Sequence, residues 1–186
     1  MAVLRIHAML RKSRANGPGA RTVLWLQGCP FRCPECFNPG LRDPAGGRSI
    51  TVEALLHRIK SIRGIEGISI SGGEPTEQIP GLVILLERVR KETDLSILLF
   101  SGRTMKDILC LPQGERLISL IDVLVDGPYD PSCANPPGAW PSSASQTIHI
   151  LSPRYALSDF SSLPALELII TEDGEVVQSG LGTVKF

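Results

Sequence analysis

The stretch LWLQGCPFRCPECFNPG, residues 24–40, joins a strand-like apolar run to a loop with three cysteines. The run 22–26 is short and apolar, which predicts a buried strand, and the glycine and prolines that follow it are turn residues. Cys29, Cys33 and Cys36 lie in this turn, with three residues between the first pair and two between the second. Ligands of α/β proteins bind at loops that follow the carboxyl ends of strands, so the stretch predicts both a fold class and the location of a site.

Three thiols in one loop fit an iron–sulfur cluster in which one iron has no protein ligand better than a site whose ligands all come from the protein. A disulfide uses two cysteines, whereas a structural zinc site and a fully protein-ligated [4Fe–4S] cluster each use four ligands. Three thiolates can hold three irons of such a cluster, and the remaining iron is then free to bind the amino and carboxylate groups of S-adenosylmethionine. The alternatives are a zinc site completed by His57 or Cys110 and a chance clustering of cysteines.

Length and composition indicate one soluble domain. The 186 residues are 42% hydrophobic, and we expect a single domain over residues 1–186 with its core at about 3–155. The formal net charge is +0, so the overall charge does not favour nucleic acid or a membrane surface as a partner. No apolar run approaches the ~18 residues of a membrane span, and the first residues lack a signal-peptide pattern. Five cysteines without a secreted disulfide framework favour a reducing, cytoplasmic location.

Strand-like and helix-like segments alternate along the chain, which predicts an α/β fold with a largely parallel sheet. Thr51 suits the N-cap of one helix, and Pro80 suits the first turn of another. The Asp173-Gly174 pair lies between two strand-like runs and predicts a C-terminal β-hairpin at about 165–180. The predicted sheet strands are Val3–Ala8, Thr22–Leu26, Gly67–Ser71, Leu95–Phe100, Ile121–Val125 and Thr147–Leu151.

Four motifs in this order resemble those of the radical S-adenosylmethionine superfamily. They are NGPGAR at 16–21, the C-x3-C-x2-C spacing in LWLQGCPFRCPECFNP, ISISGGEP at 68–75 and IDVLVDGPY at 121–129. The set is similar to the activating proteins of anaerobic ribonucleotide reductase and, more loosely, to pyruvate formate-lyase activating enzymes. The resemblance spans roughly residues 3–155, with a weaker echo in the hairpin. It implies a partial (βα) barrel, one [4Fe–4S] cluster on the three cysteines, and S-adenosylmethionine as a second cofactor.

The resemblance also implies which residues bind the cofactor. In SGGEP the ligand would be the methionyl amino group, and glycines there permit close approach of the backbone, although a plain turn would look the same. Many relatives place an aromatic residue just before the last cysteine, against the adenine. Here Glu35 holds that position, and Phe37 follows the cysteine instead. The residues expected at the cofactor are Glu35, Phe37, Asn38, Ser71, Gly72, Gly73, Glu74, Ser101 and Asp126.

The NGPGAR segment has a less specific interpretation. Its match to the activating enzymes suggests a loop near the cofactor or the partner protein, whereas Gly-Pro-Gly alone is only a tight turn. Four basic residues make this region locally positive, and a solvated surface explains most of them; they are Arg11, Lys12, Arg14 and Arg21.

The function implied is activation of a glycyl-radical enzyme. A second cysteine cluster is absent, so the chain is similar to a minimal activator that takes a hydrogen atom from a glycine of a large partner, with a flavodoxin- or ferredoxin-type protein as electron donor. One alternative is a tailoring enzyme for a peptide or small molecule, such as an epimerase that uses Cys133 as hydrogen donor. Cys133 lies in the proline-rich segment 127–145, which predicts an irregular loop, either a lid, a partner-facing segment or a bystander. A non-catalytic iron–sulfur module is a further alternative.

Overall fold

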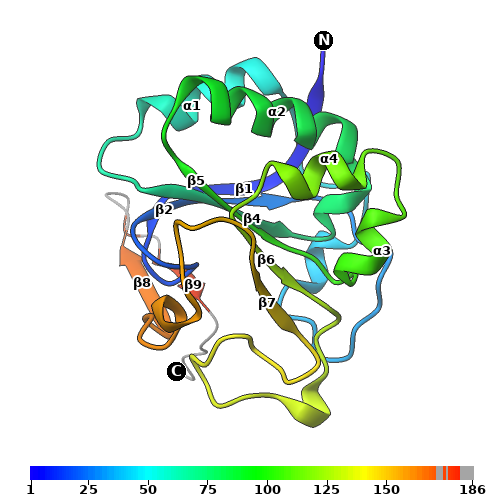
Figure 1. Ribbon diagram of the computed structural model, residues 1–186, viewed down its shortest axis with the longest axis vertical. Helices are drawn as coiled ribbons and strands as arrows, with labels where there is room; N and C mark the ends of the chain where they lie inside the picture. Colours follow the sequence, from blue (N-terminus) through cyan, green and yellow to red (C-terminus); the bar gives the residue numbers. More distant parts are fainter. Residues whose placement is uncertain (171–173, 175, 181–186) are drawn as a thin grey trace.

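The computed structural model describes residues 1–170, 174 and 176–180, and it has a mixed α/β fold (Figure 1). A seven-stranded sheet has the order β3-β1-β2-β4-β5-β6-β7. Strands β2, β4, β5 and β6 are parallel, while β1, β3 and β7 pair antiparallel with their neighbours. The strand bounds are β1 Val3–Ser13, β2 Arg21–Leu26, β3 Arg48–Thr51, β4 Gly67–Gly72, β5 Ser96–Phe100, β6 Val123–Asp126 and β7 Thr147–Ile150.

The predicted strands are confirmed, with two differences at the edge of the sheet. Strand β1 continues to Ser13, well beyond the predicted end at Ala8. Strand β3 was not predicted, because its four residues include a single buried apolar side chain, Ile50, and show no period-2 pattern. It forms because residues 48–51 pair with β1 along the edge of the sheet. The mixed topology follows from these antiparallel edge pairs around a parallel centre.

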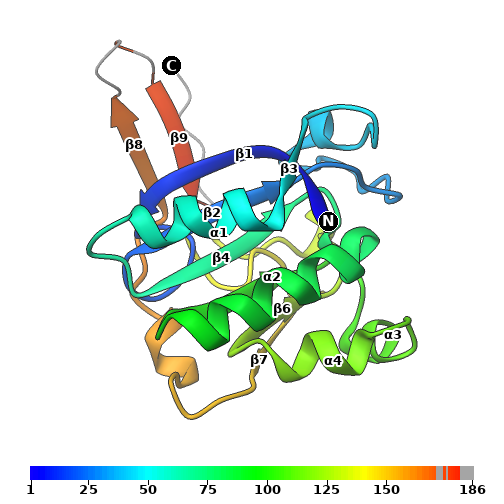
Figure 2. The ribbon, with the colours of Figure 1, turned by 90° about the horizontal axis from the view of Figure 1, so that it is seen from above.

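Helices α1 Val52–Ser61, α2 Ile79–Glu92 and α4 Gly114–Ser119 cover one face of the sheet, and α3 Met105–Leu109 lies beside them (Figures 1 and 2). Thr51 caps α1 as predicted, because its side chain accepts a hydrogen bond from the backbone N–H of Ala54 at 3.1 Å. Pro80 lies in the first turn of α2, also as predicted. None of the helices in the described part of the chain has the length and apolar character needed to cross a membrane.

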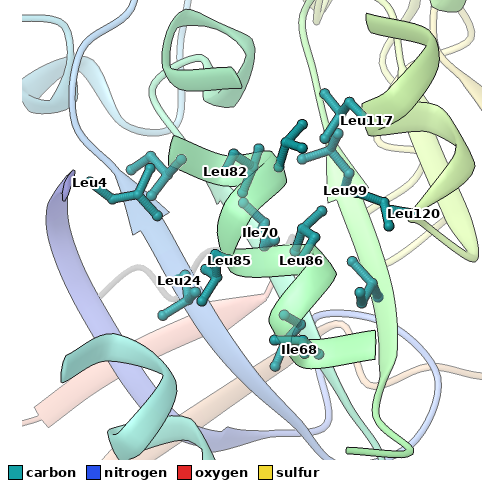
Figure 3. Close-up of a cluster of buried hydrophobic side chains, with 14 of the residues drawn as sticks. Leu4, Leu24, Ile68, Ile70, Leu82, Leu85, Leu86, Leu99, Leu117 and Leu120 are labelled. Carbon is teal, nitrogen blue, oxygen red and sulfur yellow. The ribbon is translucent and has the colours of Figure 1, made fainter. Parts of the chain in front are cut away.

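The main core lies between these helices and the sheet (Figure 3). Leu24, Ile70 and Leu99 of the strands are fully buried there, together with Leu82 and Leu86 of α2. Alternate residues of a strand point to opposite faces, so β4, GISISG, turns its isoleucines toward the helices and its serines away from them. The second face of the same strands can therefore carry polar groups.

The C-terminal hairpin is confirmed as a separate two-stranded sheet. Strands β8 Leu166–Ile170 and β9 Val176–Gly180 pair antiparallel, and they project from the side of the molecule away from α2 (Figure 2). Asp173 of the predicted turn lies outside the described residues. The hairpin is joined to the NGPGAR segment, where Asn16 Nδ2 donates to Ser179 Oγ at 2.5 Å.

The remaining segments are short turns and loops. Segment 127–145 is irregular as predicted, apart from one short helix and an isolated bridge between Ala134 and Ser143. Of the four basic residues near NGPGAR, Arg11, Lys12 and Arg14 are exposed, but Arg21 is 0% exposed. The 3-10 helices are η1 Pro39–Leu41, η2 Pro75–Gln78, η3 Pro131–Cys133 and η4 Leu157–Phe160.

Candidate functional site

A cavity of about 520 Å³, here called the cysteine cavity, opens at the carboxyl ends of the parallel strands. Its walls come from the loops after β2, β4, β5 and β6 and from the sheet face opposite the helices, which contributes Trp25 and Phe100. The volume falls within the ~300–1,000 Å³ range typical of small-molecule sites. The predicted site residues that line it are Cys29, Cys33, Cys36, Phe37, Asn38, Ser71, Gly72, Gly73, Glu74 and Ser101.

The cysteine loop is folded against the segment around η1. The backbone N–H of Gly28 donates to Leu41 O at 2.8 Å, and that of Cys29 donates to Arg42 O at 3.1 Å. The Arg42 side chain returns across the loop, where its Nη2 donates to Cys33 O at 3.0 Å. These contacts hold the three free, partly buried thiols on one wall of the cavity.

The donor set fits an iron–sulfur cluster. Burial raises the pKa of the Cys29 thiol, and the nearby charges of Glu74, Cys36 and Cys33 raise it further. All three cysteines line the same cavity. Within the described residues no three His, Cys, Asp or Glu side chains converge on one ion. A cluster distributes its thiolates over several irons, so it does not require that convergence. The structure does not support the zinc alternative, because its proposed fourth ligands, His57 and Cys110, are exposed and lie outside the cavity lining.

The two glycines of SGGEP pack against protein backbone. Gly72 has φ +119°, and a Cβ there would lie 2.3 Å from Leu26 N. A Cβ on Gly73 would lie 2.2 Å from Gly28 O. The structure thus gives the glycines a reason other than the approach of a ligand: they let the β4 loop pack directly on the cysteine loop.

Glu74 links two loops of the cavity, those after β4 and β5, through its buried carboxylate. It is 0% exposed, and its Oε1 accepts hydrogen bonds from Thr76 N at 3.0 Å, Thr76 Oγ1 at 2.7 Å and Ser101 Oγ at 2.9 Å. Its Oε2 accepts from Gly102 N at 2.8 Å. Both oxygens therefore already have donors from this chain. Glu74 and Ser101, which the sequence suggested as separate cofactor contacts, bind each other and fix the β4 and β5 loops together.

Aromatic contacts complete two walls of the cavity. The Arg103 guanidinium lies 5.3 Å from the ring centre of Phe31, in the cysteine loop, while its Nε donates to Thr76 Oγ1 at 3.0 Å. On another wall the ring of Phe37 lies 4.9 Å from that of Tyr129, which belongs to segment 127–145. The cysteine loop is thereby supported from the β5 loop on one side and from the proline-rich segment on the other.

Three of the predicted residues lie outside the cavity lining. Glu35 is exposed, with φ +51°. Asp126 has the same strand parity as Leu124, so it faces the helices, where it accepts a hydrogen bond from Met105 N and lies 3.0 Å from His149 Nε2. Cys133 lies in η3, with its Sγ 3.7 Å from Asp130 O. The structure does not place these three side chains in the cavity that Cys29, Cys33 and Cys36 line.

Residues 15–149 match the family described as 4Fe-4S single cluster domain. The chain belongs to this family. Similar proteins include the anaerobic ribonucleoside-triphosphate reductase-activating protein of Vibrio cholerae, which is 34% identical over 141 residues, 72% of this chain and 90% of that protein. The Salmonella typhi protein of the same name is 28% identical over 155 residues, 80% of this chain and 99% of its own length. The pyruvate formate-lyase-activating enzyme of Clostridium pasteurianum is 35% identical over 97 residues, 50% of this chain and 41% of that enzyme.

The chain is thus a radical S-adenosylmethionine enzyme of the glycyl-radical activase type. The 4Fe-4S single cluster match includes the cysteine loop, the SGGEP loop and most of the parallel sheet. Strands β8 and β9 lie beyond the matched residues, yet Val177 and Ser179 of β9 line the cysteine cavity.

Sequence reasoning missed several lining residues. Trp25 was recoverable from strand parity, because it alternates with the buried Leu24 and Leu26 and must face away from the helices. Tyr129 ends the IDVLVDGPY motif but was not singled out, and Trp140 lies in a segment with no regular period, so its local sequence does not indicate that it lines the cavity. The contribution of β9 depends on contacts with the distant NGPGAR segment, so no local pattern predicts it.

Proposed function

We propose that this chain activates a glycyl-radical enzyme by removing a hydrogen atom from the α-carbon of one glycine of that partner. Anaerobic ribonucleotide reductase is the partner suggested by the relatives. The observation that carries the proposal is that Cys29, Cys33 and Cys36 line one cavity together with the SGGEP loop. We further propose that residues 1–186 act as one domain, in the reducing cytoplasm.

The three thiolates would hold one [4Fe–4S] cluster, and Phe37, Asn38 and the SGGEP loop would hold S-adenosylmethionine beside it. When bound, the pair would supply the radical chemistry of the proposal: one electron from the cluster for cleavage of the sulfonium, with removal of the glycine hydrogen atom as the outcome. The chain's own task is to bind, orient and exclude water. Trp25, Phe100 and Trp140 give the cavity apolar walls suited to this task.

The sheet is proposed to serve as a partial (βα) barrel of the radical S-adenosylmethionine type. Supporting observations are its parallel centre, helices on one face and a cavity on the other. The partner's glycine would enter past segment 127–145 and β9, because both contribute residues to the lining of the cysteine cavity.

The position of Cys133 favours an activase over an epimerase. An epimerase needs a hydrogen donor that faces the substrate, and the Cys133 thiol lies outside the lining of the cysteine cavity. A glycyl-radical activase needs no returned hydrogen, because the radical stays on the partner.

The test begins with anaerobic reconstitution of the cluster. We expect about four irons and four sulfides per chain, and loss of the cluster when the three cysteines are replaced by Ala. The reduced protein should convert S-adenosylmethionine to 5′-deoxyadenosine and produce a glycyl radical signal, detected by electron paramagnetic resonance, on anaerobic ribonucleotide reductase. A cluster that persists in the triple variant would overturn the proposal.

A further inference from the structure

A second cavity, of about 690 Å³, lies on the other side of the cysteine loop. Cys29, Phe31 and Arg42 line both cavities, so the loop is the wall that separates them. Arg5 and Arg32 line only the second cavity, which we call the arginine cavity. It gives an approach to Cys29 that does not pass through the cysteine cavity.

The arginine cavity has uncompensated positive charge. Arg5 Nη1 donates to the carbonyls of Ala45 and Gly46, both at 2.9 Å, and Arg42 donates to the carbonyl of Cys33, so neither guanidinium is neutralised by these partners. Arg32 is exposed and forms no hydrogen bond or ion pair with the described residues.

The acidic residues of the same cavity do not balance these charges. Glu77 is paired with Arg103, and Asp43 is exposed and accepts a hydrogen bond from Ala45 N at 2.9 Å. The whole chain has a formal net charge of +0, so the excess belongs to this face and not to the protein in general. A cationic concave surface attracts a partner of opposite charge and accelerates its association.

We propose that the arginine cavity is the docking surface for a protein electron donor with an acidic surface around its redox centre. The inference rests on the proposed function, which needs one electron from a low-potential donor for each turnover. In this step the donor is oxidised by one electron and the cluster on the three thiolates is reduced by one, with no atom transferred. With S-adenosylmethionine and the partner's glycine in the cysteine cavity, Cys29 and Arg42 offer the donor a route through the opposite wall.

Arg32 provides the test, because its charge can be reversed without breaking a hydrogen bond or ion pair among the described residues. The variant is Arg32→Glu, with Arg32→Lys as the charge-conserving variant. Arg63→Glu is the matched control: Arg63 is also exposed and unpaired among described residues, and it precedes the amino end of β4, whereas the cysteine loop follows the carboxyl end of β2. Stopped-flow absorbance would follow reduction of the cluster by reduced flavodoxin at several salt concentrations.

We expect Arg32→Glu to slow reduction by flavodoxin about tenfold at low salt, and the difference to shrink as salt rises. Arg32→Lys and Arg63→Glu should retain the parental rate. With dithionite, a small reductant that needs no docking surface, every variant should cleave S-adenosylmethionine like the parent. A parental flavodoxin rate and salt dependence in Arg32→Glu would overturn the docking site, whereas a parent that fails with dithionite would overturn the proposed function instead.

A second measurement does not depend on the variants. Hydrogen–deuterium exchange of the parental holoprotein, with and without flavodoxin, should show protection in residues 29–32 and 42–46. Protection confined to segment 127–145 would place the donor at the cysteine cavity and overturn the proposal.

Discussion

Arg21 and Glu74 are buried at opposite ends of the same parallel strands, and each is satisfied by neutral groups. The Arg21 guanidinium lies near the starts of β4 and β5 and donates to Ser69 Oγ at 2.7 Å, Ser96 Oγ at 3.0 Å and Tyr155 OH at 2.9 Å. It also donates to the carbonyls of Pro18, Ile68 and Ser96. Glu74 follows the end of β4 and accepts from Thr76, Ser101 and Gly102.

The two ends differ in what surrounds the buried group. Around Arg21 the sheet face is filled by the NGPGAR loop and Tyr155, where a Cβ on Gly17 would lie 2.7 Å from Leu98, and burial lowers the pKa of the arginine. Around Glu74 the same face opens into the cysteine cavity. We infer that one end of the strands stabilises the fold while the other is kept open for chemistry. Substitutions near Arg21 should therefore lower the stability of the fold, whereas substitutions near Glu74 should also lower the binding of the cluster.

The largest loss of stability is expected for Arg21→Met. The apolar side chain fills similar volume but removes the hydrogen bonds that the guanidinium donates to three carbonyls and three hydroxyls, so we expect a loss of about 3–5 kcal/mol in the free energy of unfolding. Urea denaturation measures it. Arg63→Met is the control and should change stability by less than about 0.5 kcal/mol. A loss below about 1 kcal/mol in Arg21→Met would contradict the stabilising role of this end.

Glu74→Gln should affect both properties. The amide cannot accept hydrogen bonds at both ends, so a donor from Thr76, Ser101 or Gly102 loses its acceptor, and we expect about 2–3 kcal/mol of destabilisation. Since Glu74 N donates to Gly28 O at 2.8 Å, the distortion should also lower the iron content after reconstitution. Thermal unfolding and iron analysis test this, with Glu115→Gln, at an exposed position of α4, as the control. Full iron content would show that the Glu74 contacts do not position the cysteine loop.

Gly73→Ala should lower the amount of bound cluster more than it lowers the stability of the fold. Its Cβ would lie 2.2 Å from Gly28 O, so the cysteine loop must shift, at a cost of about 1–2 kcal/mol. We expect a lower iron content, measured by iron and sulfide analysis, before any change in the affinity for S-adenosylmethionine is seen. Gly40→Ala is the matched control, since a Cβ there has no neighbour within 4 Å. An intact cluster with weakened cofactor binding would instead favour direct contact between Gly73 and the ligand.

Cys133→Ser should have the smallest effect. The thiol's one hydrogen bond among the described residues is to Asp130 O, and it lies outside the cysteine cavity, so stability should change by less than about 0.5 kcal/mol. Formation of 5′-deoxyadenosine and of the glycyl radical should both persist, as product analysis and electron paramagnetic resonance would show. A variant that consumes S-adenosylmethionine without making product would support the epimerase alternative.

The sequence by itself determined the features that depend on one local segment. Short apolar runs between turn residues located the strands of the parallel centre, and Thr51 marked the start of α1, because these preferences act over a few residues. The C-x3-C-x2-C spacing placed three thiols on one loop, since a compact turn keeps such side chains close whatever the rest of the chain does.

Only the tertiary structure decided the environment of those features. Arg21 belongs to a basic segment in the sequence but is buried, because Tyr155, 134 residues away, and serines of two other strands satisfy its donors. Glu74 is held by Ser101 of the next βα unit, and β9 supplies a wall that no motif indicates. The physical reason is that burial of a polar group depends on partners from other segments, and the sequence of one segment contains no information about which partners will reach it.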